Sequence, residues 1–342
     1  MYKDYALIIG INDYTPKEKD GLISLNAAIN DARDFEQWFL HESGGGSKER
    51  CKSVYSTRNP LKPHQEEIDK QLTALLLEAK KDSDRNRRLY FYFAGHGSGL
   101  DPDPTELALC LANWSEMNRN EALSSKKYHD VIINFGLFRQ VVIFLDCCRD
   151  IKKYVVPRHP SINTAAAAGK HMAEVFWGYA AHYTHKGYEI ATETGERRGI
   201  FTSVLMKGLR GAAANEEGVI NSASLKRYLD KQIPAEASKI EQTQKPEIND
   251  GLTEPDSVFG RVPAGILVDC VIRIDQNRGR PIHLVNGSGN VIREILDGES
   301  EVKVSLSKGL YLVKDITNNK YISIEIETRI NNKEPDLIVV NF

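Results

Sequence analysis

The feature that most constrains the fold is an alternation of short apolar runs with amphipathic segments over about the first 250 residues. The runs at 5–11, 88–95 and 140–148 are continuously apolar, which is typical of strands buried on both faces. Residues 25–42 and 64–82 instead carry apolar side chains at helical spacing. Further strands are expected at 52–57, 106–113 and 173–181, and further helices at 128–138, 201–211 and 222–233. This order predicts an α/β fold with a mainly parallel sheet flanked by helices.

The pattern changes after about Pro255. Short segments of alternating polarity, such as GILVDCVIRID and KYISIEIETR, follow one another, separated by turn-forming stretches such as QNRGR and ITNNK. We therefore predict an α/β domain over residues 1–258 and a small all-β domain over residues 259–342. The second domain is a candidate module for regulation or for binding a partner protein.

The charge balance excludes some classes of partner. The 342 residues include 45 Lys and Arg and 47 Asp and Glu, a net charge of −2, which argues against nucleic acid or an anionic membrane as the main partner. No apolar run approaches the roughly 20 residues that a membrane helix needs, and the first residues lack a signal-peptide pattern. We expect a soluble, cytoplasmic protein.

The cysteines do not suggest a disulfide framework or a zinc site. There are five, an odd number, without a CxxC pair or clustered histidines: Cys51, Cys110, Cys147, Cys148 and Cys270. We therefore expect chemistry without a metal or another cofactor.

Two predicted strands end in residues that can form a catalytic pair. YFYFAGHGSG places His96 just after one strand, and IFLDCCRD places Cys148 just after another. Ligands of open α/β sheets bind at the carboxyl ends of strands, so these two side chains can meet there. Because side chains alternate along a strand, Asp146 and Cys148 share a face, whereas Cys147 is expected in the core.

A thiol and an imidazole at one site can carry out acyl transfer. Cys148 would attack a carbonyl carbon, and His96 would take the thiol proton and protonate the leaving amine. The backbone N–H groups of Gly97 and Cys148 are the expected donors to the oxyanion. Singly, each residue also has a structural interpretation, as a strand-end histidine, a buried cysteine or a glycine turn. The presence of a histidine and a cysteine at two such strand ends favours the catalytic interpretation.

Several segments, in this order, resemble one family. They are YALIIGINDY, LNAAINDARDF, YFYFAGHGSG, VVIFLDCCRD, RRGIFTSVLMKGLRG and IEQTQKPEI. Over roughly residues 3–250 the chain resembles the caspase-like cysteine peptidases, especially prokaryotic relatives of metacaspases. The resemblance implies His96 as general acid and base and Cys148 as nucleophile.

The resemblance also implies an acidic pocket for the substrate residue before the cut. Its two carboxylates would be Asp146, two positions before the nucleophile, and Asp31 in the Asn-Asp-Ala segment. Two carboxylates at a pocket floor favour a guanidinium or an ammonium group. The structural alternatives are a carboxylate at a helix start for Asp31 and a hydrogen-bonded core acid for Asp146.

Calcium is used by several metacaspases. The stretch GLDPDPTE offers Asp101, Asp103 and Glu106, but it is not a recognisable ligand loop, and a solvated acidic turn is the favoured interpretation.

The segment after the nucleophile, residues 151–170, has neither strand nor helix pattern, and in the family this region is sometimes self-cleaved. The candidate self-cleavage sites are Lys152, Lys153, Arg158, Arg197 and Arg198.

Substrate is expected as an extended strand beside a sheet edge. We expect that edge at 175–181, where Trp177 and Tyr179 could line side-chain pockets or else be core aromatics.

The sequence thus predicts a cysteine endopeptidase that cuts after Arg or Lys, and relatives imply a role in bacterial defence or regulated cell death. Two alternatives stay open. One is a non-catalytic scaffold that acts through the β domain, and the other is a thiol hydrolase of small amides or thioesters.

Overall fold

The computed structural model describes most of the chain. The described residues are 2–42, 45–84, 86–101, 103, 105–151, 155–162, 173–191, 195–215, 217–253, 257–262, 267–275, 280–287, 289–296, 298–307, 309–318, 320–326 and 336–341.

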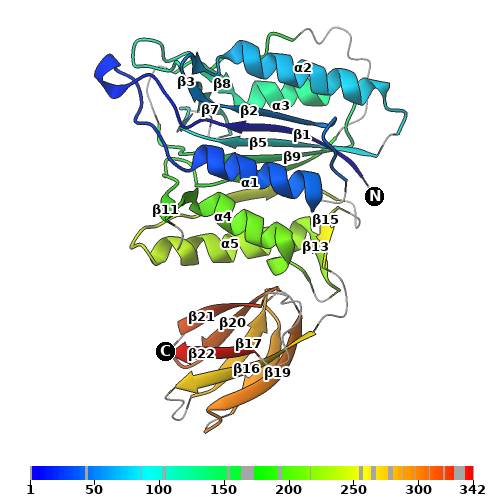
Figure 1. Ribbon diagram of the computed structural model, residues 1–342, viewed down its shortest axis with the longest axis vertical. Helices are drawn as coiled ribbons and strands as arrows, with labels where there is room; N and C mark the ends of the chain where they lie inside the picture. The colour runs from blue at the N-terminus through cyan, green and yellow to red at the C-terminus, as the bar shows by residue number, and fades with distance from the viewer. Residues whose placement is uncertain are drawn as a thin grey trace. The chain divides into compact units, whose positions relative to one another are not determined.

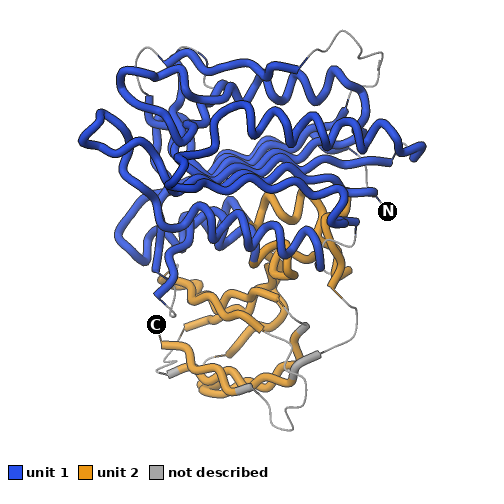
Figure 2. Tube along the Cα trace, turned by 45° about the horizontal axis from the view of Figure 1, so that its top comes forward, with its two compact units in different colours: residues 1–206, 229–254 blue, residues 207–228, 255–342 orange. Residues whose placement is uncertain are grey.

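The chain divides into two compact units, residues 1–206 with 229–254 and residues 207–228 with 255–342 (Figure 2). The predicted boundary at 258 places residues 207–228 in the first domain, and in the structure they group with the second unit. The physical reason is a strand pairing, because β13 (Val219–Asn221) pairs antiparallel with β15 (Val258–Arg261).

In the described part of the first unit, the central sheet has six strands in the order β14-β10-β9-β5-β1-β2 (Figure 1). Their bounds are β1 Lys3–Gly10, β2 Cys51–Tyr55, β5 Arg87–Ala94, β9 Gln140–Asp146, β10 Glu174–Tyr179 and β14 Glu247–Asp250. Neighbours from β10 to β2 are parallel, and β14 pairs antiparallel with β10. This confirms the predicted α/β fold with a mainly parallel sheet. Strand β14 was not predicted, because its sequence EIND contains no apolar run.

Helices cover both faces of this sheet. The helices are α1 Ala28–His41, α2 Gln65–Lys81, α3 Ser125–Asn134, α4 Ile200–Lys207 and α5 Ser222–Ser238. Helix α1 lies on one face with α4, and α2 and α3 lie on the other (Figure 1). No helix in the described residues is long and apolar enough to cross a membrane.

Alternation along the strands explains why the sheet is buried on both sides. Leu7 and Ile9 of β1 pack in one core with Ile68 and Leu72 of α2. On the opposite face, the Phe35 ring of α1 stacks on Tyr92 of β5, with ring centroids 4.6 Å apart. Both faces therefore demand apolar side chains, which is why these strands read as continuous apolar runs.

Short elements surround the carboxyl ends of the central strands. They are a 3-10 turn η1 Lys17–Lys19, and strands β3 Thr57–Arg58, β4 Leu61–Lys62, β6 Gly97–Gly99, β7 Leu107–Cys110, β8 Ala122–Ser124, β11 Glu189–Ala191 and β12 Arg197–Gly199. Strands β6, β7 and β8 form a small antiparallel sheet, so the strand expected at 106–113 lies outside the central sheet. Strands β11 and β12 form an antiparallel pair.

The second unit contains the predicted all-β fold. Its strands after β15 are β16 Leu267–Asp275, β17 Ile282–Asn286, β18 Val291–Ile295, β19 Glu301–Ser307, β20 Gly309–Asp315, β21 Lys320–Ile326 and β22 Asp336–Asn341. Among the described residues they form the sheets β19-β16-β22 and β18-β17-β20-β21. Both sheets contribute to one apolar core, with Ile272 and Val340 from the first and Leu284 and Val313 from the second. The unit also includes a π-helical turn, η2 Gly208–Ala212, where the predicted helix 201–211 changes pitch.

Candidate active site

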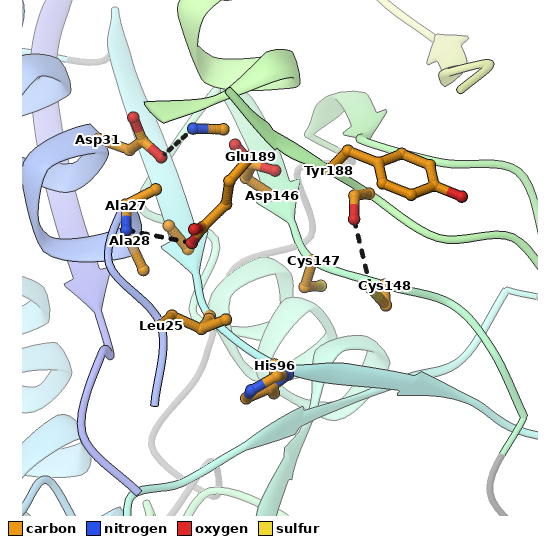
Figure 3. Close-up of a pocket in the computed structure, with 14 residues that line it drawn as sticks. Leu25, Ala27, Ala28, Asp31, His96, Asp146, Cys147, Cys148, Tyr188 and Glu189 are labelled. Atoms are coloured by element: carbon orange, nitrogen blue, oxygen red, sulfur yellow. Dashed lines mark hydrogen bonds between the residues drawn. The ribbon is translucent and has the colours of Figure 1, made fainter. Parts of the chain in front are cut away.

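The register of two neighbouring strands places His96 and Cys148 together. Strands β5 and β9 pair in parallel with Ala94 opposite Asp146, and the Gly95 N–H donates to the Asp146 carbonyl at 3.2 Å. His96 and Cys148 each lie two residues beyond this last pair. Both line one cavity of about 80 Å³ (Figure 3). The structure therefore brings the two predicted residues to one site.

Contacts that the sequence did not predict orient the histidine. The His96 backbone N–H donates to the Tyr14 hydroxyl at 2.7 Å, and the Tyr14 ring packs against the imidazole with centroids 4.8 Å apart. Nε2 of His96 lies 2.8 Å from the carbonyl oxygen of Ile23. A carbonyl only accepts, so in the neutral ring Nε2 carries the proton and Nδ1 carries the lone pair. This tautomer is the one that lets Nδ1 accept a proton from a thiol.

The Cys148 thiol is half-buried and makes one hydrogen bond to the backbone. Its Sγ lies 3.7 Å from the Gly187 carbonyl oxygen, to which the S–H donates. Burial raises the pKa of Cys148, and the nearby charges of Asp150 and Asp146 raise it further. The resting group is therefore a thiol at neutral pH, and forming the nucleophilic thiolate requires a base beside it.

The position of Gly97 fits its predicted role as an oxyanion donor. The Cys110 N–H donates to the His96 carbonyl at 2.9 Å, so the following pair, Gly97 opposite Leu109, is a non-hydrogen-bonded pair of the antiparallel ladder. The Gly97 N–H therefore faces away from β7. Gly99, two residues on, has the same orientation and donates to the Asp150 carbonyl at 3.2 Å, beyond Cys148. The Gly97 N–H thus faces the side where Cys148 lies.

Replacing Gly97 by alanine is expected to lower kcat roughly 10- to 100-fold. A Cβ at this position would lie 2.7 Å from Cys147 Sγ and 2.8 Å from the Cys148 carbonyl oxygen, so the two strand ends must move apart. Steady-state kinetics with a peptide substrate measures the loss, and thermal unfolding shows whether the fold survives. Unchanged kcat in a folded variant would contradict a role for this N–H.

The two predicted acidic residues meet on the α1 face of the sheet. Asp146 Oδ2 accepts bonds from the Thr202 N–H at 3.1 Å and hydroxyl at 2.6 Å, and Asp31 Oδ2 accepts from the Gly199 N–H at 2.8 Å. A Cβ on Gly199 would lie 2.4 Å from Asp146 Oδ2 and 3.0 Å from Asp31 Oδ2, so the two carboxylates flank the same backbone. Both residues line the cavity.

Burial and mutual repulsion govern the charge of this pair. Burial raises the pKa of Asp146 to about 6, although hydrogen bonds from Thr202 favour its ionised form. Burial, followed by the charge of Asp146, raises the pKa of Asp31.

One oxygen of the pair is left without a donor. Asp31 is 1% exposed, and its Oδ1 has no hydrogen-bond partner among the described residues. Nη1 of Arg198 lies 3.8 Å away, which is an ion pair too long for a hydrogen bond. A buried acceptor of this kind is costly unless a ligand, a water or a proton on the carboxyl group satisfies it.

Glu189 is a cavity residue that the sequence reasoning missed. It lies on β11, and its Oε1 accepts from the Ala27 N–H at 3.1 Å and the Asn26 N–H at 3.4 Å, at the start of α1 (Figure 3). No local pattern in GYEIATE distinguishes this glutamate from a surface one. Its role depends on the long-range pairing of two segments about 160 residues apart.

Arg149, directly after Cys148, was also missed as a structural residue. It is 1% exposed, and its Nη1 donates to Glu247 of β14 at 2.6 Å and to the Ala181 carbonyl at 3.1 Å. Its guanidinium lies 4.2 Å from the ring centre of Tyr179. These contacts fix the chain just beyond Cys148.

The expected substrate edge at 175–181 is wrong. Strand β10 pairs with β9 on one side and β14 on the other, so its hydrogen-bonding edges are both occupied. Trp177 and Tyr179 stack on each other with centroids 5.5 Å apart and pack in or against the apolar core. Neither of them lines the cavity.

The candidate self-cleavage sites have different surroundings. Arg158 pairs with Glu121 and forms a β-bridge to Leu123. Arg197 is exposed on β12, and Arg198 is held by the Asn30 carbonyl at 2.8 Å and by ion pairs with carboxylates of α1. Lys152 and Lys153 lie outside the described residues.

The acidic turn at 99–106 does not bring three ligands together. Asp103 accepts from Thr105 and pairs with Lys126 at 3.0 Å, and these contacts hold its pKa at about 2. The described residues contain no group of three or more His, Cys, Asp or Glu side chains placed to hold a metal ion.

The chain is similar to proteins with a caspase domain. The family model of the caspase domain matches residues 3–255. Among solved structures, the chain is similar to caspase-1 from Spodoptera frugiperda, with 12% identity and a TM-score of 0.48, over 77% of this chain and 92% of that one. A comparison with curated proteins finds no match. The family model covers well over half of the residues, and the chain therefore belongs to the caspase-domain family of cysteine peptidases.

Proposed function

We propose that this cysteine peptidase is an endopeptidase that uses Cys148 and His96 to cleave after Arg or Lys. The observation that carries the specificity is the buried Asp31 carboxylate, whose Oδ1 lacks a donor, next to Asp146 at the cavity that also holds the thiol. A guanidinium or ammonium group supplies both the missing donor and a compensating positive charge.

The reaction follows from the tautomer of His96. Nδ1 takes the proton from Cys148 Sγ as the sulfur attacks the scissile carbonyl carbon. The N–H groups of Gly97 and Cys148 stabilise the oxyanion of the tetrahedral intermediate. His96 then gives its proton to the leaving nitrogen, the C–N bond breaks, and a thioester remains. The Ile23 carbonyl favours the protonated ring during this cycle, because it accepts from Nε2–H.

Water completes the turnover. His96 removes a proton from the water, which attacks the thioester carbonyl, and the acid product leaves as the proton returns to sulfur. Only the Cys148 thiol and the His96 imidazole need to change their protonation states. The high resting pKa of the thiol makes the base essential for the first step.

The substrate backbone fits beside residues 187–190 better than beside β10. Gly187, Tyr188 and Glu189 line the cavity on the segment that leads into β11. Among the described residues β11 pairs with β12 alone, so its other edge can accept an extended peptide.

A panel of fluorogenic peptides tests the proposed function. Peptides that differ only in the residue before the cut, Arg, Lys, Leu or Asp, are compared with Cys148→Ala as the control. Turnover of the Arg and Lys peptides, at least roughly 100-fold above the Asp peptide, supports the proposal. Equal turnover of all four, or turnover that survives in the control, would refute it.

Specificity for a cation is expected to weaken in acid. The ratio of kcat/KM for an arginyl peptide to that for its neutral citrulline isostere should fall by up to roughly 10-fold per pH unit below about pH 6. Only the ionised carboxylate attracts a cation, and the pKa of Asp146 is raised to about 6, so its neutral form predominates below that pH. Taking the ratio cancels the titration of the dyad. A ratio that stays constant from pH 7 to pH 5 would contradict the role of this carboxylate.

The resemblance also implies self-cleavage and a part in defence or regulated cell death, and the β unit is a candidate for binding a partner protein. These stay predictions. Arg197 is the most exposed of the described candidate self-cleavage sites. An intact wild-type band during incubation, identical to that of Cys148→Ala, would remove self-cleavage from the account.

A further inference from the structure

The Gln244 side chain is a buried amide in the segment IEQTQKPEI, which has no part in the proposed reaction. Gln244 is 1% exposed. Its Oε1 accepts from the Tyr188 N–H at 3.0 Å, and its Nε2 donates to the Ala180 carbonyl at 2.9 Å. Because a backbone N–H only donates and a carbonyl only accepts, one orientation of the amide satisfies both partners. Gln244 is therefore a bridge between two backbone segments.

The bridge runs from the end of the central sheet to the wall of the cavity. Ala180 follows β10, and its N–H donates to the Leu145 carbonyl of β9 at 3.0 Å, just before the turn that carries Cys148. Tyr188 lines the cavity on the segment that leads into β11 (Figure 3). Gln244 thus connects the cavity wall to the sheet at the place where Cys148 lies.

Gln244 also completes the β11–β12 ladder at the point where β12 changes into a helix. The Ile200 N–H donates to the Tyr188 carbonyl at 2.9 Å, which makes these residues a hydrogen-bonded pair of the antiparallel ladder. In a continuing strand the Ile200 carbonyl would accept from the Tyr188 N–H. Helix α4 begins at Ile200, so that carbonyl accepts within the helix, and the Gln244 amide is the acceptor instead.

The next residue of β11 presents its backbone to the open edge. Glu189 pairs with Gly199, and hydrogen-bonded and non-hydrogen-bonded pairs alternate along an antiparallel ladder. The N–H and carbonyl of Glu189 therefore point away from β12, toward the edge where an extended substrate is proposed. The position of this edge depends on how Tyr188 is held, and Gln244 holds it.

We propose that Gln244 is a positioning residue that fixes the cavity wall at Tyr188 beside Cys148, so that the open edge of β11 can bind the substrate backbone. This inference rests on the proposed function, since it concerns the path of the same substrate. It gives Gln244 a part in substrate binding, although this residue does not line the cavity.

The alternative is that Gln244 only stabilises the fold. Two substitutions in the same segment provide a matched comparison. Gln244→Met removes both hydrogen bonds and keeps a long side chain, whereas Gln242→Met makes the same change at an exposed glutamine. A third variant, Gln244→Glu, keeps an acceptor for the Tyr188 N–H and, when ionised, loses the donor to Ala180.

The test compares a long and a short substrate of the full-length chain. A tetrapeptide that ends in an arginyl coumarin amide can pair with the β11 edge, whereas benzoyl-arginyl coumarin amide reaches only the thiol and the carboxylate pair. Gln244→Met should lower the long-to-short ratio of kcat/KM roughly 10-fold, the effect of about one hydrogen bond, through a higher KM with little change in kcat. Gln244→Glu should lower the ratio roughly 3-fold, and Gln242→Met should leave it unchanged.

Hydrogen exchange gives a readout that needs no turnover. In the Cys148→Ala background, Gln244→Met should speed amide exchange in the peptide that contains residues 187–190 at least roughly 10-fold, because the Tyr188 N–H loses its acceptor. Gln242→Met should leave this exchange unchanged.

Three results would overturn the inference. They are an unchanged long-to-short ratio in Gln244→Met, an equal loss for both substrates, and the same fall in Gln242→Met. Where Gln244→Met does not fold, an unchanged ratio in Gln244→Glu is the overturning result. Failure of the proposed function looks different, because the wild type then cleaves no arginyl or lysyl peptide. In that case hydrogen exchange decides on Gln244, and unchanged exchange at 187–190 would refute its role.

Discussion

Replacing Cys148 by alanine is expected to lower kcat/KM toward an arginyl peptide by roughly 10⁴-fold or more, down to the background rate. In the proposed mechanism the Cys148 sulfur forms the covalent intermediate, and we do not expect another described cysteine to substitute for it. Cys110 and Cys270 are buried, and Cys51 has a pKa raised to about 12 by burial. His96→Ala should be nearly as damaging, since the resting thiol needs a base, and the double variant should be no worse than Cys148→Ala.

The neighbouring cysteine provides a matched control. Cys147 is 3% exposed, packs in the apolar core and also lines the cavity that holds Cys148. Cys147→Ala removes a sulfur one residue earlier and should keep activity within several-fold, with a stability cost of about 1 kcal/mol for the small cavity. A Cys148→Ala enzyme that still turns over, or a Cys147→Ala enzyme that is equally inactive, would show that the wrong thiol has been assigned.

Replacing Asp31 by asparagine is expected to lower kcat/KM for an arginyl peptide roughly 100-fold, and that for a citrullyl peptide much less. The amide oxygen of the new side chain would still accept from the Gly199 N–H but would offer no charge to a guanidinium. The substitution is not expected to reduce the stability of the fold. Burial and Asp146 raise the pKa of Asp31, so the ionised form is disfavoured in the folded state, and its removal should not lower the melting temperature at neutral pH.

Asp34 is the control for this variant. It lies one turn along α1, and its carboxylate pairs with Arg198 at 3.5 Å and does not line the cavity. Asp34→Asn should keep the preference for arginine. If Asp31→Asn kept the full preference for arginine, the proposed role of the Asp31 carboxylate in binding the substrate cation would be contradicted. If Asp34→Asn lost the same preference, the loss would be explained by displacement of Arg198, the ion-pair partner of both residues.

The strands of the central sheet were predictable because burial on both faces leaves an apolar signature along the chain. The runs at 5–11, 88–95 and 140–148 became β1, β5 and β9. Strand β14 was not predictable in this way, since its four residues hold one buried side chain. That short strand covers β10 and thereby overturned the expected substrate edge.

The candidate dyad was predictable because both residues follow strands that became neighbours. The residues that orient it were not. Nothing in the sequence marks the carbonyl of Ile23 or the hydroxyl of Tyr14 as partners of His96, because these contacts arise from loops. Asp31 and Asp146 were inferred from resemblance, whereas Glu189 depends on a tertiary pairing of β11 with the start of α1.

The most direct test of the whole account is covalent labelling by a peptide that ends in an arginyl chloromethyl ketone, mapped by mass spectrometry. We expect one label per chain, on Cys148 Sγ, and we expect labelling to be slower in His96→Ala and at least roughly 100-fold slower with a glutamyl analogue. Labelling of another cysteine, or equal rates for the arginyl and glutamyl reagents, would contradict it.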